Sequence, residues 1–181
     1  MKEDLILLFS GGADSTLLLK MAISIGYTPL CIIFDYGQIH KKEIDYAIKT
    51  CNKYSLGYEV IHIPLDGVSS ALTDGNAQYE GVSEWHVPSR NLIFISLATS
   101  IAESKGIKRI WYGANYGDRE NLFPDCYQEW VYKLNELLAI NGSMIVEVEA
   151  PLLGLKKDSI LQLMKTYNID KSEIFSGYGQ D

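Results

Sequence analysis

The chain has 181 residues, a formal net charge of −7 and a hydrophobic content of 47%, which suit one globular domain with a sizeable core. The acidic balance argues against a nucleic-acid partner, because such proteins usually present a basic patch and lysine and arginine cluster here only as pairs. No apolar run approaches the roughly 20 residues that a membrane helix needs, and a strand pattern beginning at once leaves no room for a signal peptide. Three widely spaced cysteines offer neither a zinc pattern nor an obvious disulfide framework. We therefore expect a single cytoplasmic domain over residues 1–181.

Strand and helix patterns alternate along the whole chain. Short, nearly continuous apolar runs, typical of strands buried in a parallel sheet, predict strands over 4–9, 29–35, 58–63, 109–113 and 144–149. Apolar residues at helical spacing predict helices over 14–25, 39–54, 91–105, 127–140 and 156–167. This order predicts an α/β fold with a Rossmann-like parallel sheet of about five strands and helices on both faces.

The segment from Leu5 to Thr16 carries the strongest functional signal. A strand pattern ends in Ser10-Gly11-Gly12, and a helix pattern begins at once with Asp14 and Ser15. The glycines allow positive φ and a close approach to a ligand, and the unpaired N–H groups of a helix start attract phosphate. The spacing is neither a Walker A loop nor a Gly-x-Gly-x-x-Gly turn. We interpret it as a phosphate-binding loop, with a plain strand-to-helix turn as the structural alternative.

Three polar stretches are predicted to meet at one edge of the sheet. They are residues 10–15, 35–40 and 113–125, and each follows a predicted strand. Ligands of open α/β sheets bind outside the carboxyl ends of the strands. The coincidence favours a functional site at this edge. The long polar connection over 64–89 is a further candidate for a functional loop.

The first loop resembles the pyrophosphate loop of the ATP-pyrophosphatase superfamily, whose adenine nucleotide alpha hydrolase-like domains cleave ATP to AMP and pyrophosphate. Later stretches narrow the resemblance to the 7-cyano-7-deazaguanine synthase family, also called QueC. These stretches are 34–43, 87–91 with Phe94 and Ser96, 113–115 leading to Asp118, 123–126, and 150–152 with Lys157. The ordered matches span nearly the whole chain and are specific in combination.

The resemblance implies that the carboxylate of 7-carboxy-7-deazaguanine is converted into a nitrile with ammonia and two molecules of ATP. A carboxylate is a poor electrophile, so its oxygen is first adenylated and ammonia then gives an amide. A second adenylation, now of the amide oxygen, precedes the nitrile. The expected partners are thus small molecules, a deazapurine carboxylate and ammonia, with ATP and Mg²⁺ as cofactors. A homodimer is expected from the family and from a surface rich in aromatic residues.

The chemistry and the resemblance together assign residues to the nucleotide. Loop N–H groups and the Ser10 and Ser15 hydroxyls are expected to hold pyrophosphate, while Asp14 orients the loop or binds Mg²⁺. Lys157 is expected to contact phosphate, with a solvated helix residue as the alternative. Asp35 is expected to bind ribose or the loop backbone, with a pair of acids formed with Glu43 as the alternative. The cofactor-binding set is therefore Phe9, Ser10, Gly11, Gly12, Asp14, Ser15, Thr16 and Asp35, and the catalytic set is Asp14, Arg90 and Lys157.

The acid is assigned to residues from two other stretches. Arg90, at a predicted helix start, is expected to bind phosphate or the substrate carboxylate, with a solvated arginine as the alternative. Asp125 is expected to recognise the purine edge, with a helix N-cap as the competing role. The substrate-binding set is Arg90, Asn91, Asp118 and Asp125.

The histidines receive no catalytic role. His40 is expected to be a hydrogen-bonded residue at a helix start. No role is predicted for His62 or His86.

The chain departs from the family pattern in three places. The family ends in a four-cysteine zinc cluster, whereas 175–181 contains no cysteine, so no zinc is expected. Ser89 precedes the motif arginine where the family usually has glycine, and 119–122 replaces a small, aromatic loop. These departures leave open a variant that stops at the 7-amido product or adenylates another acid or a tRNA base. They also leave open a non-catalytic nucleotide-binding subunit.

Overall fold

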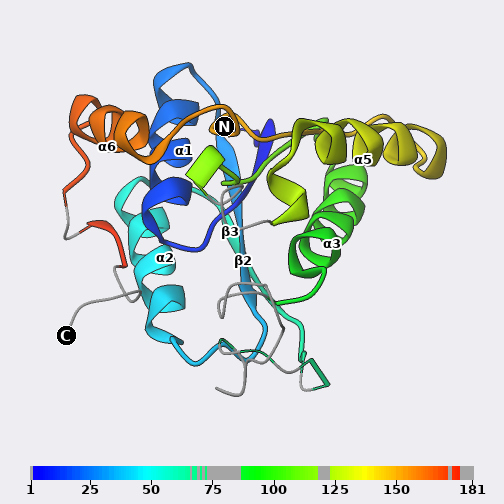
Figure 1. Ribbon diagram of the computed structural model, residues 1–181, viewed down its shortest axis with the longest axis horizontal. Helices are drawn as coiled ribbons and strands as arrows, with labels where there is room; N and C mark the ends of the chain where they lie inside the picture. The colour runs from blue at the N-terminus through cyan, green and yellow to red at the C-terminus, as the bar shows by residue number, and fades with distance from the viewer. Residues whose placement is uncertain are drawn as a thin grey trace.

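The computed structural model describes residues 2–65, 67–68, 70, 72, 87–117, 123–170 and 173–175. Its first half alternates strictly: β1 (Leu5–Leu8), α1 (Ala13–Ser24), β2 (Pro29–Asp35), α2 (Lys42–Lys53) and β3 (Tyr58–His62). The second half contains α3 (Arg90–Lys105), β4 (Arg109–Trp111), the 3₁₀ helix η1 (Pro124–Cys126), α5 (Gln128–Asn141), β5 (Glu147–Glu149) and α6 (Lys157–Thr166) (Figure 1). Among the helices in these ranges, none is long and apolar enough to cross a lipid bilayer.

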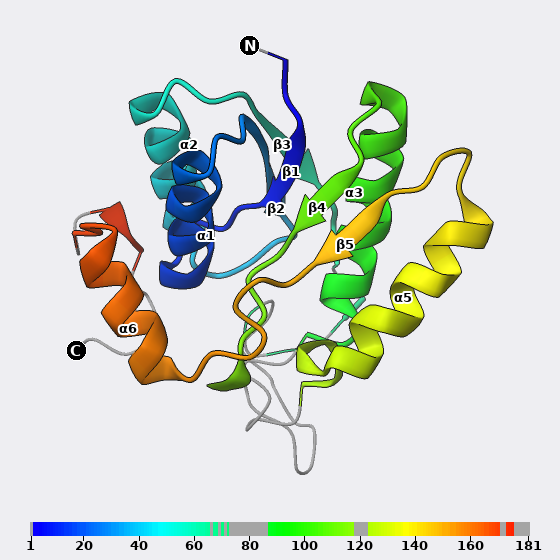
Figure 2. The same ribbon diagram turned by 90° about the horizontal axis from the view of Figure 1, so that it is seen from above.

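The five strands form one parallel sheet in the order β3-β2-β1-β4-β5. Helices α1, α2 and α6 cover one face of this sheet, and α3 and α5 cover the other (Figure 2). The chain moves from β1 outward to β3 and then returns to the other side of β1 with β4. This reversal places a topological switch point beside β1, where ligands of such sheets bind. The predicted α/β architecture is confirmed.

Two apolar cores, one on each face, explain why the strands are continuous apolar runs. In β1, Leu5 and Leu7 point to the face of α1, while Ile6 points to the face of α3. Successive side chains of a strand alternate between faces, so a strand covered on both sides needs apolar residues throughout. The three cysteines lie buried in these cores as free thiols.

Two predicted elements, a helix and a strand, each begin three residues later in the structure than predicted. The helix predicted over 39–54 begins only at Lys42, because the Ile39 N–H donates to the Leu72 carbonyl at 2.9 Å. His40 therefore precedes α2, and its carbonyl accepts the Glu43 N–H at 3.0 Å. The strand predicted over 144–149 is limited to Glu147–Glu149, after a bend at 142–144.

The β5 edge of the sheet is protected by the side chain of Asn135. Asn135 of α5 accepts the Val148 N–H through Oδ1 and donates to the Val148 carbonyl through Nδ2, both at 2.8 Å. Its Nδ2 also donates to the Val131 carbonyl at 3.0 Å. A sheet edge with unpaired backbone groups invites pairing with other chains. Asn135 therefore occupies at β5 the place that a sixth strand would take.

We expect Asn135→Ala to lower the free energy of unfolding by about 2 kcal/mol, because Val148 then lacks partners for two backbone groups. Urea denaturation of the variant and its parent measures the change. Asn141→Ala is the matched control, since Asn141 is exposed at the end of the same helix. Equal stability of the two variants would contradict this account of the sheet edge.

Candidate active site

A cavity of about 940 Å³ opens at the carboxyl ends of β1, β2 and β4. Its wall combines the loop after β1, the turn after β2, the start of α3 and the segments after β4. The three polar stretches singled out in the sequence therefore meet there, as predicted. The cavity is within the size range of small-molecule sites. Ile174 and Phe175, from the C-terminal segment, complete its lining.

The loop after β1 depends on a glycine at position 11. Gly11 has φ +78°, and a Cβ there would lie 3.0 Å from Ala47 N and 3.1 Å from Glu43 O of α2. The conformation disfavours any L-residue, and the space between the loop and α2 excludes a side chain. Only glycine meets both conditions, and it allows the loop to lie directly against the first turns of α2.

The loop presents hydrogen-bond donors to the cavity. Helix α1 begins at Ala13 without a side-chain cap, so the N–H groups of its first turn have no intrahelical partner. The Ser10 and Ser15 hydroxyls lie 3.2 Å apart, and Ser10 Oγ accepts the Gly12 N–H at 3.3 Å. The Ser15 hydroxyl also donates to the Gly12 carbonyl at 3.2 Å. With the helix dipole, the N–H groups of this turn suit an anion of phosphate size.

Asp14 lies at the same helix start with its carboxylate held by an amide. Asn115 Nδ2, beyond β4, donates to Asp14 Oδ2 at 3.3 Å. Burial raises the pKa of Asp14, and the charge of Lys157 partly opposes that rise. Lys157 is exposed at the start of α6 and acts on Asp14 through its charge. The carboxylate thus faces the cavity beside the phosphate-sized site.

Arg90 is the first residue of α3 and contributes to the cavity wall. Its Nη1 donates to the Tyr36 hydroxyl at 3.3 Å, and its Cζ lies 5.6 Å from the centre of the Tyr36 ring. No acidic side chain in the described ranges forms an ion pair with it. Its remaining donors are therefore free to bind an anionic ligand. Ser89, just before it, has φ +54° and ψ +17°, a left-handed conformation.

Asn91 and Asp125 form a hydrogen-bonded pair in the cavity wall. Asn91 Nδ2 donates to Asp125 Oδ2. Asp125 lies inside η1, and no side chain caps the start of η1 or α5, so the alternative role of Asp125 as an N-cap is wrong. The Tyr112 hydroxyl donates to the Asp125 carbonyl at 2.7 Å, which fixes this segment against β4.

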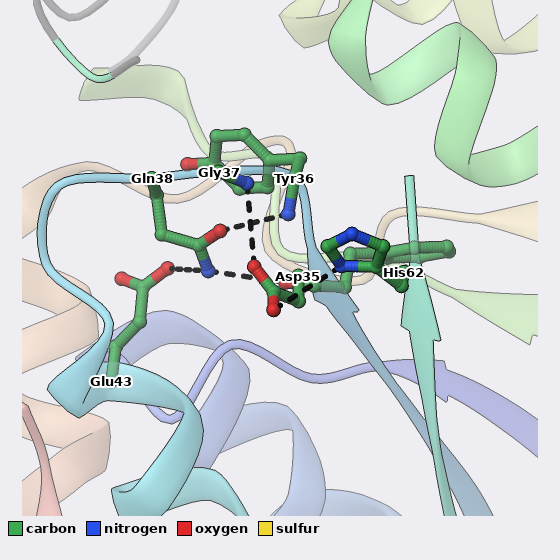
Figure 3. A network of polar contacts seen from close by, with 7 residues as sticks. Asp35, Tyr36, Gly37, Gln38, Glu43 and His62 are labelled. Carbon is green, nitrogen blue, oxygen red and sulfur yellow. Dashed lines mark hydrogen bonds and ion pairs between the residues drawn. The ribbon is translucent and has the colours of Figure 1, made fainter. Parts of the chain in front are cut away.

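A buried polar network follows β2 (Figure 3). Gln38 accepts the Tyr36 N–H at 2.9 Å and donates to Phe34 O at 3.1 Å and to Glu43 Oε1 at 2.9 Å. Gln38 and Glu43 are only 2% and 7% exposed. Burial raises the pKa of Glu43, while the Gln38 hydrogen bond and the Arg90 charge act in the opposite direction. Gln38 therefore fixes the turn and the carboxylate of Glu43 at once.

Asp35 lies on the other side of this turn. Its Oδ1 accepts the Gly37 N–H at 3.3 Å, and its Oδ2 lies 3.3 Å from His62 Nδ1 at the end of β3 (Figure 3). The loop-backbone role is thus present, and the alternative pairing of Asp35 with Glu43 is wrong. Asp35 is absent from the described cavity wall, so nucleotide binding by it stays a prediction.

The predicted residues fall into three groups by position. Phe9, Ser10, Gly12, Asp14, Ser15, Arg90, Asn91 and Asp125 line the cavity. Gly11, Thr16 and Lys157 are absent from the cavity wall. Gly11 packs against α2, Thr16 is fully buried without a described partner for its hydroxyl oxygen, and Lys157 is exposed. Asp118, the 119–122 loop, His86 and residues 176–181 lie outside the described residues.

Tyr36, Gln38, Asn115 and Phe175 belong to the site but received no role from the sequence. Tyr36, Gln38 and Asn115 lie within stretches that carried the resemblance, so their position was a usable signal. Phe175 N donates to Gly11 O at 2.9 Å across more than 160 residues of chain, and no local pattern indicates such a contact.

Comparison with known proteins agrees with this geometry. A family model described as "Queuosine biosynthesis protein QueC" matches residues 4–181. The 7-cyano-7-deazaguanine synthase of Caldicellulosiruptor saccharolyticus is 37% identical over 182 residues, which cover 96% of this chain and 80% of that protein. The enzyme of the same name from Psychromonas ingrahamii is 36% identical, over 98% of this chain and 85% of its own length.

Solved structures share the fold. The U34-tRNA thiolase NcsA from Methanococcus maripaludis has a TM-score of 0.63 at 17% identity, covering 99% of this chain and 61% of its own. NMN synthetase from Francisella tularensis has a TM-score of 0.55 at 18% identity, covering 97% of this chain and 69% of its own. At these identities the similarity concerns the architecture of the sheet and helices.

Gly11→Ala should lower the free energy of unfolding by about 3 kcal/mol, because a left-handed alanine and a crowded Cβ add their costs. Chemical denaturation measures this. Gly154→Ala is the control, since nothing lies within 4 Å of a Cβ built at that position. A loss of less than about 1 kcal/mol at position 11 would show that the loop moves away from α2 at little cost.

Ser89→Gly should raise the free energy of unfolding by about 0.5–1 kcal/mol, because relief of the left-handed serine exceeds the extra chain entropy of glycine. Thermal or urea unfolding gives the sign. Ser104→Gly, inside α3, should act in the opposite direction because glycine disfavours a helix. Destabilisation by both changes would contradict the strain assigned to Ser89.

Proposed function

Since this chain belongs to the QueC family, we propose that its cavity converts the carboxylate of 7-carboxy-7-deazaguanine into a nitrile, using ammonia and two molecules of ATP. One observation carries the proposal: the uncapped start of α1 and an arginine without an ion-pair partner among the described residues line the same cavity. The first suits a nucleotide and the second an organic acid. The cavity is therefore built to bring ATP and a carboxylate together.

The nucleotide's phosphates are assigned to the loop after β1. The N–H groups at the start of α1 supply donors for the departing pyrophosphate. The Ser10 and Ser15 hydroxyls bond to each other, and Ser15 also donates to Gly12, so they would turn toward the phosphate when it binds. Asp14 suits Mg²⁺, because its carboxylate lies beside the phosphate-sized site and is fixed by the neutral Asn115. When bound there, Mg²⁺ would neutralise charge on the phosphates. Lys157 adds a positive charge near Asp14.

The acid is assigned to the part of the cavity wall formed by the turn after β2, the start of α3 and η1. Arg90 is oriented by Tyr36 and suits the carboxylate that is to be activated. Phe34 and Phe94 stack at 4.0 Å between ring centroids in an apolar wall that suits a flat purine-like ring. Asp125 suits the N–H donors of a guanine-type edge, and Asn91 fixes its orientation.

The assigned chemistry has two adenylations. A carboxylate oxygen attacks the α-phosphorus, the bond to pyrophosphate breaks, and ammonia then displaces AMP from the acyl carbon to give the amide. The amide oxygen is adenylated in the same way, and loss of AMP and a proton leaves the carbon–nitrogen triple bond. The protein contributes position and electrostatic stabilisation to both steps. The names of the most similar relatives favour the nitrile over the amide as the final product.

We further propose that two copies of the chain associate and work in the cytoplasm. The association is supported by four exposed apolar side chains on or next to α5: Tyr132, Leu137, Ile140 and Ile145, of which Ile140 is 84% exposed. Contiguous exposed apolar surface is typical of an interface.

The function is tested by incubating the protein with 7-carboxy-7-deazaguanine, ammonium chloride and MgATP. We expect AMP, pyrophosphate and the nitrile, identified by mass spectrometry, in a ratio of two AMP for each nitrile. Asp14→Asn should lower the rate on the order of 100-fold, because it removes charge from the phosphate site.

Asp45→Asn serves as the matched control, since Asp45 is exposed on α2. It should keep the activity of the parent. If no AMP forms with this acid, the assigned substrate is wrong. If AMP forms but the amide accumulates, the variant that stops at the 7-amido product is the correct alternative.

A further inference from the structure

The assigned reaction needs ammonia as its nucleophile. At neutral pH dissolved ammonia is mostly ammonium, which has no lone pair for attack. An enzyme using it must bind a small cation that donates hydrogen bonds, and must remove one proton. Resting on the function proposed above, we propose that the Glu43 carboxylate is the ammonium-binding and proton-accepting site of the cavity.

Glu43 is placed for this role by α2 and Gln38. It lies in the first turn of α2, is 7% exposed and lines the cavity. Its Oε1 accepts the Gln38 Nε2 hydrogen bond at 2.9 Å, and its Oε2 accepts none from the described residues. Figure 3 shows that Gln38 approaches the carboxylate from the turn after β2. One oxygen is therefore fixed and the other is left for a ligand that donates hydrogen bonds.

The charge of Glu43 is not balanced by a direct partner. Within the described part of the chain, no lysine, arginine or histidine forms an ion pair with it. Arg90 acts on it only through its charge, while its own hydrogen bond goes to Tyr36. A nearly buried carboxylate normally requires a cationic partner, and its absence among the described residues points to a cation that arrives with the substrates.

The surroundings suit ammonium better than a metal ion. Among the described residues, no group of three histidine, cysteine or acidic side chains lies together as metal ligands usually do. Hard divalent ions require about six oxygen ligands, whereas ammonium is satisfied by a few acceptors. Burial also raises the pKa of Glu43, which makes it a better proton acceptor than an ordinary glutamate.

The position of Glu43 matches the point where the nucleophile is needed. Its backbone carbonyl lies against Gly11 of the phosphate-binding loop. Its carboxylate is near Arg90, to which we assign the substrate carboxylate. Ammonium bound at Oε2 would thus lie close to both the phosphate-binding loop and the substrate carboxylate at Arg90.

One proton passes from ammonium to Glu43 Oε2, and the freed lone pair forms a bond to the acyl carbon of the adenylate. The bond from that carbon to the AMP oxygen breaks, and AMP leaves with the bonding pair. Nitrogen loses a further proton to water as the amide forms, and Glu43 returns its proton to solvent.

Glu43→Gln provides the test, because glutamine keeps the size of the side chain and the hydrogen bond from Gln38. We expect kcat/KM for ammonium chloride, with 7-carboxy-7-deazaguanine and MgATP, to fall about 100-fold or more. Two reactions without ammonium should stay within about threefold of the parent. These are acid-dependent exchange of labelled pyrophosphate into ATP and conversion of 7-amido-7-deazaguanine to the nitrile.

The outcomes separate the two proposals. If the parent protein gives neither exchange nor product with the acid, the proposed function fails. If the parent is active but Glu43→Gln keeps its dependence on ammonium, or loses all three activities equally, Glu43 is not the ammonium site. Glu59→Gln, on a surface glutamate paired with Lys105 at 2.8 Å, is the matched control and should keep all three activities.

Discussion

The close packing of the loop after β1 on the first turns of α2 is the constraint on which the site depends. A Cβ at position 11 would lie 3.0 Å from Ala47 N, so the loop can pack this closely only if residue 11 is glycine. That contact brings the donors of α1 and the carboxylate of Glu43 into one cavity wall. Phe175 N binds Gly11 O from the other side, so the C-terminal segment is fixed at the same point.

The sheet explains why these pieces meet beside β1. Its order reverses there, because β2 lies on one side of β1 and β4 on the other. The loops after these strands consequently diverge and leave a crevice between them, and Asp14 and Asn115 contact each other across it. The tight loop at Gly11 and the strand order of the sheet therefore both place the cavity beside β1.

The sequence predicted the sheet and helices well, because strands covered on both faces need unbroken apolar runs such as 29–35. It also identified the stretches that form the cavity. It was wrong about the start of α2, because Ile39 bonds to the distant Leu72 and Gln38 bonds back into the turn after β2. The pairing of Asp35 with His62 instead of Glu43 depends on the register of β2 with β3, which no single segment specifies.

The three carboxylates of the cavity wall share one form of support. Each accepts a hydrogen bond from a side-chain amide: Asp14 from Asn115, Glu43 from Gln38 and Asp125 from Asn91. An amide orients a carboxylate without neutralising it, whereas a lysine or arginine partner would cancel its charge. Arg90 is likewise oriented by the neutral Tyr36 hydroxyl. Burying these charges without a directly bonded partner of opposite sign costs folding free energy. In return, each charge remains available to a ligand of opposite sign or to a donor on the purine.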